Sequence, residues 1–423
     1  MSDTSTQHVI YPEDKLPFTK NIIASVQHII AMFGATVLGP LLMGFDPNVA
    51  ILFSGVATLI FYFCVSGKIP SYLGSSFSFI AAVIAVTGYT GTGANSHLDI
   101  ALGGILAAGL LYAGVGYLVT RIGHVWIESL LPPVLTGVIV AVIGLNLAPV
   151  AVHQINGSLS DIAFGLMTIT FVALAAVYLP RFWARLPILI GGAAASLLYC
   201  VAGNVLGLVK PIGFADFIGA DWLGVPHFSY PAFDITAITM IAPVAIILMA
   251  ENLGHVRAIA AMTERNLDDS LGRAFMGDGL ATIVSSFFGG TGVTTYAENM
   301  GVMAITKNFS SRTFVFAGVI AILLGFSPKF GALIHLIPSP VIGGLSFVVF
   351  GLITATAGRI WVDGKINFSD PKNLITVGVT AVIGAGDLSI KIGSFSLGGI
   401  AVATFTAIGL YHGLAYVEKH KKQ

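Results

Sequence analysis

Charge is scarce in this chain, because only 9% of its 423 residues are Asp, Glu, Lys or Arg. An ordinary soluble domain carries about 25%. Hydrophobic residues instead make up 56% of the chain. A water-soluble fold with so few charges could not keep that much apolar surface away from water. The composition therefore excludes a soluble globular protein and predicts one that lies largely within a membrane.

Cysteine is also rare, and neither sign of charge is in excess. The two cysteines, Cys64 and Cys200, lie inside apolar stretches, which favours small buried side chains over a disulfide or a metal site. The 20 Lys and Arg residues balance 20 Asp and Glu residues, so no basic surface for nucleic acid is expected. No catalytic triad, metal-ligand set or phosphate-binding loop is visible. We therefore expect neither an enzyme nor a protein that holds a cofactor.

Long apolar runs, in contrast, recur along the whole chain. A membrane-spanning helix needs about 20 mostly apolar residues, because hydrocarbon offers no hydrogen bonds to the backbone. Together with shorter, interrupted stretches, the charge-free runs predict an all-helical polytopic protein with about fourteen spans. The charge-free runs are 21–45, 47–67, 101–120, 129–160, 162–180, 186–209, 313–328, 330–358 and 392–417, and the interrupted stretches are 71–84, 235–256, 275–290, 296–306 and 373–386.

The basic residues indicate how these spans are oriented. When alternate loops are assigned to alternate sides, only Lys210, Lys329 and Lys391 of the 20 Lys and Arg residues fall opposite the N-terminus. The positive-inside rule then places both termini in the cytoplasm. The first 18 residues are polar and have no apolar segment of the kind found in signal peptides.

An even count of fourteen divides into two halves of seven spans, and an odd number per half gives the halves opposite orientations. We therefore predict two inverted repeats. The predicted divisions are a cytoplasmic tail at 1–18, a first repeat at 19–210, an extracytoplasmic connection at 211–233, a second repeat at 234–417 and a cytoplasmic tail at 418–423.

The third span of each half is interrupted. Residues 72–79 read YLGSSFSF and residues 289–299 read GGTGVTTYAEN, both rich in Gly, Ser and Thr and poor in helix formers. Flexible loops at the membrane surface are the alternative, but each stretch lies between apolar residues and carries almost no charge. Broken helices at matching places in two halves indicate a transporter's binding site.

Three acidic residues, Glu251, Asp278 and Glu298, fall inside apolar spans. A charge at the bilayer centre costs at least about 2.5 kcal/mol, so such residues are functional candidates. The alternative is a protonated carboxyl that joins neighbouring helices by hydrogen bonds. We favour a functional role for Glu251 and Glu298 and leave the role of Asp278 open, since it could lie near a cytoplasmic helix end.

The surroundings of the two glutamates predict their chemistry. His255 follows Glu251 by four residues, which places both on one helix face and is typical of proton coupling; a histidine that only faces the cytoplasm is the alternative. Glu298 is expected near the N-terminus of a half-helix that ends by Thr306, where free N–H groups stabilise an anion. With the ring of Phe77, these groups suit a flat heterocycle with alternating N–H and C=O groups, such as uracil.

Several motifs resemble one family, the nucleobase/ascorbate transporters, also called the nucleobase:cation symporter-2 family. The run 297–307, AENMGVMAITK, fits the family signature through Glu298, Asn299, Gly301, Thr306 and Lys307. The Gln27-His28 pair and the runs 68–79 and 250–256 are similar to bacterial uracil permeases. The resemblance covers essentially the whole chain.

The resemblance implies a core and a gate domain, short antiparallel strands at the breaks of spans 3 and 10, and a substrate between them. The implied uracil contacts are Ala35, Phe77, Glu251, Ala297 and Glu298, with His255 supporting Glu251 in proton coupling. Phe350 stands where uracil permeases have a Tyr that pairs with this histidine. The hydrogen bonding around His255 should therefore differ here.

The sequence thus predicts a proton symporter of uracil or a related pyrimidine in a bacterial inner membrane. Its expected partners are the nucleobase and membrane lipid, and a homodimer is left open. A purine permease specific for xanthine is the first alternative, although purine carriers of the family often have Gln in place of Glu298. A channel or a membrane-embedded enzyme is the second, but a channel would not need a paired buried Glu and His, and the motifs of an enzyme are not visible.

Overall fold

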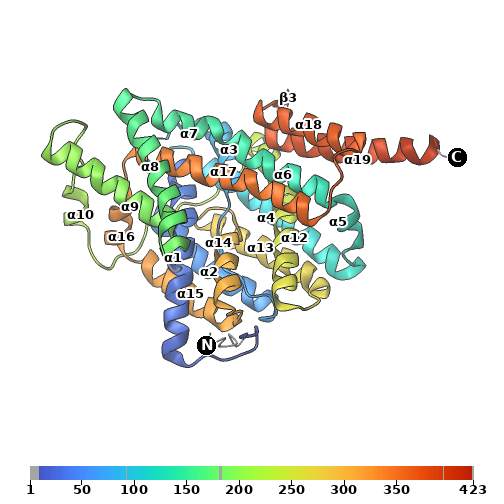
Figure 1. Cartoon of the computed structure of the whole chain (residues 1–423), viewed down its shortest axis with the longest axis horizontal. Helices are drawn as coiled ribbons and strands as arrows, with labels where there is room; N and C mark the ends of the chain where they lie inside the picture. The colour runs from blue at the N-terminus through green and yellow to red at the C-terminus, as the bar shows by residue number, and fades with distance from the viewer. Residues whose placement is uncertain (1–8, 92, 181–182, 394, 422–423) are drawn as a thin grey trace, which may run out of the picture.

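A computed structural model describes residues 9–91, 93–180, 183–393 and 395–421 (Figure 1). Residues 1–8 and 422–423 of the two predicted tails lie outside the described residues. The elements of the first half are α1 (Phe18–Met43), α2 (Pro47–Cys64), β1 (Leu73–Ser75), a 3-10 turn (Phe77–Phe79), α3 (Ile80–Thr87), α4 (Leu98–Ile122), α5 (Val125–Leu130), α6 (Pro133–Asn146), α7 (Ala148–Ile155), α8 (Leu159–Tyr178), a 3-10 turn (Trp183–Arg185), α9 (Pro187–Cys200), a π turn (Val201–Val205) and α10 (Ala215–Gly219).

The second half begins after α10. Its elements are α11 (Ile235–Ile241), α12 (Val244–Thr263), a 3-10 turn (Asp268–Ser270), α13 (Leu271–Phe287), β2 (Val293–Thr295), α14 (Ala297–Thr306), α15 (Ser311–Gly325), α16 (Pro328–His335), α17 (Ser339–Asp363), α18 (Pro371–Ala385), β3 (Ile390–Ile392), β4 (Phe395–Leu397) and α19 (Gly399–Lys421). In this half α11 and α12 form one apolar stretch that is followed by α13, a strand and further helices.

Local sequence sets several of these boundaries. Helix α1 ends at Met43 because Gly44 adopts a left-handed conformation with φ of 73°. Asp46 then begins α2, since its side chain accepts a hydrogen bond from the backbone N–H of Asn48 and Pro47 occupies the first helical position. These signals turn the chain sharply between two apolar helices.

In the described part of the chain, nine helices are long and apolar enough to cross a membrane, or ten if the bent pair α15–α16, with its 81° angle, counts as one. Four other predicted spans contain shorter helices, namely α3, α13, α14 and α18, with 8, 17, 10 and 15 residues. The protein is therefore a mostly helical, multi-pass membrane protein, and the count of fourteen stays a prediction.

The long helices pack in pairs that cross between the two halves. Helix α2 packs against α15, α4 against α13, and α6 against α17. Gly55 of α2 lies against Gly318 of α15, and Gly109 of α4 lies against Gly279 of α13. Small residues at such contacts let helix backbones approach closely, which drives association where lipid removes the hydrophobic effect.

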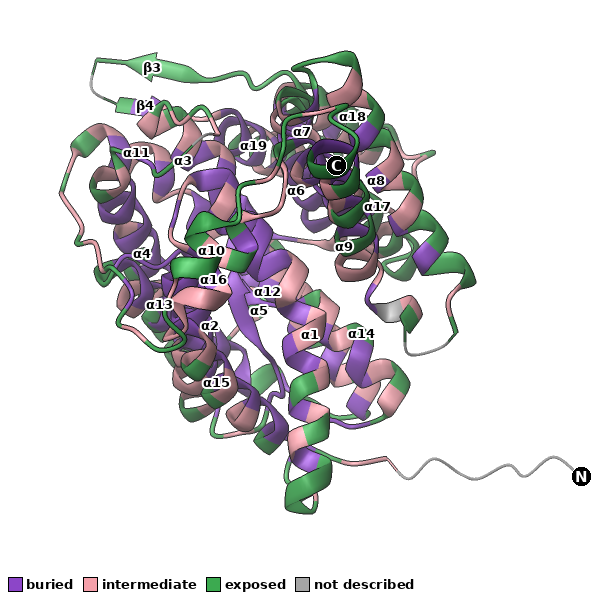
Figure 2. Ribbon diagram, turned by 90° about the vertical axis from the view of Figure 1, so that its left-hand side faces the viewer, coloured by how far each residue is buried: buried purple, intermediate pink, exposed green. Residues whose placement is uncertain are grey.

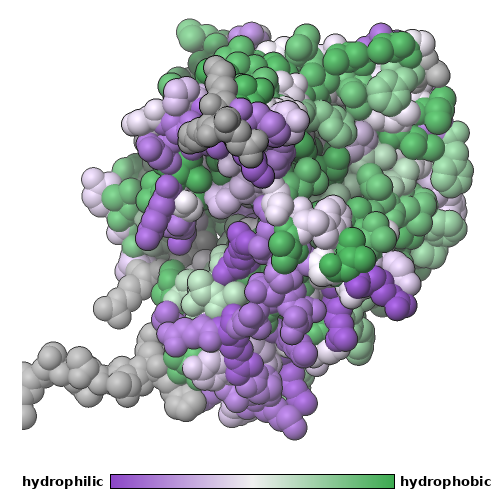
Figure 3. All heavy atoms as spheres, turned by 90° about the vertical axis from the view of Figure 1, so that its right-hand side faces the viewer, coloured by the Kyte–Doolittle hydropathy of each residue, from purple (hydrophilic) through white to green (hydrophobic). Residues whose placement is uncertain are grey.

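Burial separates the inner elements from the outer ones. Figure 2 shows α12 and its neighbours largely buried, whereas α10 and the β3–β4 hairpin are largely exposed. Apolar side chains also cover much of the outer surface in Figure 3, with polar side chains gathered mainly in the lower part of that view. A broad exposed apolar surface is expected where lipid chains replace water.

The β3–β4 hairpin was not anticipated from the sequence. The last apolar run was predicted to extend over 392–417, but α19 begins only at Gly399. Residues 390–392 and 395–397 instead form two short antiparallel strands, with Ile392 paired to Phe395. The run is apolar enough for a helix, so hydropathy alone could not distinguish the hairpin from the start of the span.

Candidate functional site

The two interrupted segments meet in a short antiparallel ladder, as the family resemblance implied. Each strand contributes three residues, and the ladder joins the first half of the chain to the second. The pairs are Leu73 with Thr295, Gly74 with Thr294, and Ser75 with Val293. The ladder continues at one end, where the Ser76 N–H donates to the Gly292 carbonyl over 2.9 Å. Irregular backbone is thereby satisfied in the interior of the molecule.

Hydroxyl groups from two neighbouring helices complete the ladder. The backbone N–H of Leu73 donates to Thr58 Oγ1 on α2 over 3.0 Å. The N–H of Val293 donates to Thr282 Oγ1 on α13 over 3.2 Å. Each strand therefore has its outer edge capped by a threonine, so no backbone donor at these two positions is left without a partner.

Two glycines allow aromatic rings to lie directly on the ladder. A Cβ atom at Gly74 would lie 2.6 Å from the ring of Tyr296, and one at Gly292 would collide with the ring of Phe79. The Tyr296 hydroxyl in turn donates to the Ser75 carbonyl over 3.0 Å. Gly74 and Gly292 are therefore required by the close packing of these rings.

A cavity of about 80 Å³ lies beside this ladder. Polar side chains from the ladder, α12 and α14 line it together with apolar side chains of α6 and α17. The lining residues are Ser75, Ser76, Phe77, Ser78, Val140, Ile143, Glu251, Thr294, Thr295, Tyr296, Ala297, Glu298 and Ile353. Four of the five predicted substrate contacts are thus brought together from α12, α14 and the 3-10 turn that follows β1.

Glu298 lies in the first turn of α14, which begins at Ala297 and ends at Thr306, as expected. No side chain caps this helix N-terminus. Its free N–H groups and positive dipole end therefore lie at the cavity wall, where they favour a negative charge or a carbonyl oxygen. Ala297 is exposed, so the cavity is open beside the start of α14.

Two fully buried side-chain atoms of the cavity-lining residues have no hydrogen-bond partner within the described protein. They are Oε2 of Glu251 and Oγ1 of Thr294. A buried polar group without a partner costs about 1–3 kcal/mol, so such atoms normally satisfy a ligand or water. Glu251 was predicted from the sequence and Thr294 was not. Its place in the interrupted segment 289–299 was the available signal.

His255 does not contact Glu251 in the way that their spacing suggested. No hydrogen bond or ion pair joins the two side chains, although both lie in the described part of α12. Instead His255 Nδ1 lies 2.7 Å from Thr295 Oγ1 on β2. Four-residue spacing puts two side chains on one face, but the hydroxyl of β2 decides where the imidazole points.

Phe350 and Ala35 also differ from simple expectation. The Phe350 ring packs edge-on against Phe77, with ring centroids 6.2 Å apart and planes at 82°. Phe350 therefore braces the aromatic wall of the cavity. Ala35 is buried on α1 but does not line the cavity. Its neighbour Thr36 instead donates a hydrogen bond to the Tyr296 hydroxyl over 3.2 Å.

Asp278 lies in a separate polar cluster. It is fully buried and lies inside α13, away from both of its ends. Its Oδ2 atom accepts a 2.7 Å hydrogen bond from Asn252 on α12 and a 3.4 Å one from the Tyr112 hydroxyl on α4. Asp278 therefore ties α4, α12 and α13 together. Asn252 adjoins Glu251 along α12, but its role was not predicted from the sequence.

A third group of titratable side chains lies away from the cavity. His124, Glu128 and Asp268 are close enough to share a metal ion. However, Arg257 Nη2 lies 2.6 Å from Glu128 Oε1. The arginine already supplies the positive charge that the carboxylate requires, so this group is an ion pair between α5 and α12.

Comparison with known proteins identifies the family. The Permease family profile matches residues 19–392. The chain belongs to this family. The permease is 55% identical over 409 residues to a protein of Escherichia coli (strain K12) named "Putative pyrimidine permease RutG", covering 96% of this chain and 92% of that one. It is 37% identical over 417 residues to the uracil permease of the same strain, covering 96% and 94%.

Solved structures establish the fold. The permease matches the transmembrane domain of the cyanobacterial bicarbonate transporter BicA with a TM-score of 0.62 at 14% identity, covering 94% of this chain and 98% of that one. It matches the murine Solute Carrier 26 family member A9 anion transporter with a TM-score of 0.69 at 11% identity, covering 96% of this chain and 69% of that one. Such low identities show a shared transporter architecture and nothing about substrate.

Proposed function

We propose that this permease imports uracil or a closely related pyrimidine nucleobase together with a proton. The names of its relatives support the substrate class, since one is named a pyrimidine permease and others are named uracil permeases. The Glu251 and Glu298 carboxylates beside one small cavity support the coupling, because a carboxylate that changes its protonation between two states can carry the proton.

One observation carries the proposal. Glu251 Oε2 and Thr294 Oγ1 are unpartnered beside a cavity that also has a phenyl ring and an uncapped helix end. A pyrimidine base offers N–H groups for the carboxylates, carbonyl oxygens for the hydroxyl and the α14 N–H groups, and a flat face for Phe77. Each unsatisfied group would then find a partner of matching chemistry.

The proposed roles follow from position. Glu251 and Glu298 accept hydrogen bonds from the base, Phe77 contacts its face, and Ala297 contributes backbone at the start of α14. Ala35 would join these contacts only in a conformation that brings α1 closer. His255 acts on Glu251 indirectly, since its hydrogen bond to Thr295 ties α12 to the substrate-side strand.

A release path is also proposed. A second cavity, of about 390 Å³, lies between α6, α12 and α17, the same three helices that contribute to the substrate cavity. It is lined by Leu253 and Arg257, which follow Glu251 along α12. Given the proposed topology, this cavity opens toward the cytoplasm, so a base released from Glu251 would leave through it.

The proposed topology is fourteen spans in two inverted repeats, 19–210 and 234–417, joined by 211–233, with cytoplasmic tails at 1–18 and 418–423. The helix contacts support it, because they come in matched pairs: α2 with α15 and α13 with α4, α8 with α17 and α18 with α6, α8 with α9 and α18 with α19. A homodimer also stays a proposal. Cysteine labelling from either side of the membrane would test the topology.

Transport in proteoliposomes tests the function. With an inward proton gradient, labelled uracil should accumulate, and a protonophore should abolish the accumulation. Unlabelled uracil and thymine should compete, whereas xanthine should compete weakly. Uptake driven by a sodium gradient alone would overturn proton coupling, and stronger competition by xanthine than by uracil would assign the permease to purines.

A further inference from the structure

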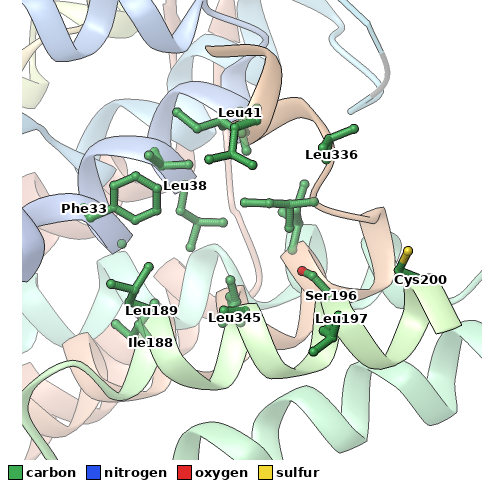
Figure 4. A pocket seen from close by; sticks show the side chains of 18 of the residues that line it. Phe33, Leu38, Leu41, Ile188, Leu189, Ser196, Leu197, Cys200, Leu336 and Leu345 are labelled. Carbon is green, nitrogen blue, oxygen red and sulfur yellow. The ribbon is translucent and has the colours of Figure 1, made fainter. Parts of the chain in front are cut away.

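An apolar cavity of about 390 Å³ lies outside the substrate site, between α1 and α9 (Figure 4). Phe33, Leu38 and Leu41 of α1 face Ile188, Leu189 and Leu197 of α9 across it. Residues of α16 and the beginning of α17 close the remaining sides. The substrate site uses neither α9 nor α16, so this cavity is separate from it.

The cavity is elongated along α9. Its α9 lining runs from Ile188 to Cys200 at helical spacing, so one continuous face of the helix is used. At 1.5 Å per residue this face is about 18 Å long, slightly more than half of the roughly 30 Å hydrocarbon layer. Leu197 in its wall is 67% exposed, so the cavity opens onto the apolar surface. Its length therefore suits a chain from one bilayer leaflet.

Water is a poor occupant for this cavity. Ser196 carries the only hydroxyl among the described lining residues, and its Oγ atom has no hydrogen-bond partner. A buried water needs two to four polar partners, and apolar cavities otherwise stay dry. A hydrocarbon chain would instead restore the contacts that the lining side chains lack.

A second cavity, of about 560 Å³, continues from the first, since Ile212, Leu336 and Ile337 line both. Unlike the first cavity, it has polar and charged walls, because Lys210 and Asp161 line it together with two histidines. An apolar cavity that continues into a second cavity with charged walls suits an amphiphile rather than a simple hydrocarbon.

The two charged residues of this second cavity indicate which headgroup a bound amphiphile would carry. Lys210 makes no ion pair in the described part of the chain, and Asp161 is bound only by Ser158, whose hydroxyl lies 2.8 Å from its Oδ2 atom. One unpaired cation and one carboxylate together complement a headgroup that carries both a phosphate and an ammonium group. A headgroup with negative charge alone would leave Asp161 opposed by like charge.

We propose that these two cavities form a phospholipid-binding site for phosphatidylethanolamine. One acyl chain lies between α1 and α9, the phosphate lies against Lys210, and the ammonium group donates to Asp161. The site goes beyond nucleobase transport, and its occupant links α1 to α9 without contacting the ladder or the two glutamates.

Native mass spectrometry of the purified full-length permease tests this site. Phosphatidylethanolamine should remain bound at least tenfold more than phosphatidylglycerol added at the same concentration. Ser196→Phe should lose this retention because its ring fills the apolar cavity, and Lys210→Gln should reduce it about tenfold. Leu174→Phe on exposed α8 and Lys391→Gln on β3 are the matched controls and should retain lipid as the parent does.

The outcomes separate the alternatives. Lys210 is exposed, so Lys210→Gln should fold and bind uracil normally even if Ser196→Phe fails to fold. Unchanged lipid retention in Lys210→Gln would overturn the proposal, as would equal loss in the controls. Displacement of the lipid by free phosphoethanolamine at equal concentration would show a site for a small phosphate compound and would also overturn it.

Discussion

Two regions of the permease bury acidic side chains, and the surroundings of the carboxylates differ between them. In the core cluster, Asp278 Oδ2 receives hydrogen bonds from Asn252 and Tyr112 on two other helices, while its Oδ1 has no partner and lies beside none of the described cavities. In the substrate cavity, Glu251 Oε2 has no partner. The two regions adjoin on α12, where Glu251 of the substrate cavity is followed directly by Asn252 of the core cluster. The difference teaches that a buried acid with an unpartnered oxygen does not by itself mark a site, whereas such an acid in the wall of a cavity does.

Glu251→Ala should have the largest effect on this comparison. The substitution removes a substrate acceptor and the proposed titrating group together, so both uracil binding and proton-driven uptake should fall to the level of empty liposomes. Isothermal titration and uptake of labelled uracil measure the two effects. Asp216→Asn on exposed α10 serves as the control. Retained uptake in Glu251→Ala would place Glu251 with Asp278 as a structural acid.

Glu298→Gln should weaken uracil binding by roughly 10- to 150-fold, because a hydrogen bond to a charged group contributes about 1.5–3 kcal/mol. The shape of the side chain is kept, so the melting temperature in detergent should change little. Binding as tight as in the parent would exclude direct contact. Tighter xanthine binding in this variant would favour the purine alternative.

Asp278→Ala should have the opposite effect to Glu298→Gln, lowering stability more than uracil affinity. Removal of the shared acceptor leaves the Asn252 amide buried without a partner, which should lower the free energy of unfolding by about 1–3 kcal/mol. Thermal denaturation in detergent measures this loss, and uracil affinity of the folded fraction should change much less than in Glu298→Gln. A large loss of affinity at unchanged stability would make Asp278 a site residue and erase the distinction.

Thr295→Val should have a smaller effect, since it removes one neutral hydrogen bond to His255, worth about 0.5–1.5 kcal/mol. Binding should persist, while the pH optimum of uptake should shift in Thr295→Val and in His255→Ala alike. A double-mutant cycle would give a non-zero coupling energy between them. If Phe350→Tyr moved the same optimum, a new hydroxyl near the cavity would also reach this network.

Glu13→Gln should have the smallest effect and extends the comparison to an exposed acid. Hydrogen bonds from Arg265 hold the pKa of Glu13 below its ordinary value. Its contribution to stability is present above the ordinary glutamate pKa and is lost as pH falls through the lowered one. At pH 7 the free energy of unfolding of the parent should exceed that of Glu13→Gln by less than about 1 kcal/mol. At acid pH the two proteins should be equally stable in thermal denaturation.

The sequence predicted those features that depend on local chemistry. Apolar runs located the helices, and Gly, Ser and Thr in residues 72–79 and 289–299 located the two breaks. The contacts of His255 and Asp278 could not be predicted, because their partners lie 40 residues away at Thr295 and 166 residues away at Tyr112. Helical periodicity fixes which face a side chain shares, but the opposing element decides its partner.

The β1–β2 ladder also bears on how the permease is made. Ser75 and Thr291, whose hydroxyl groups lie 2.6 Å apart, are separated by 216 residues. At ~5–20 residues per second, the ribosome needs roughly 10 to 40 s to make the chain between them. For that time the backbone of β1 stays unpaired inside or beside the bilayer. Until then it needs water, the insertion machinery or Thr58 to occupy its hydrogen-bonding groups, so the first half matures only after part of the second half has been made.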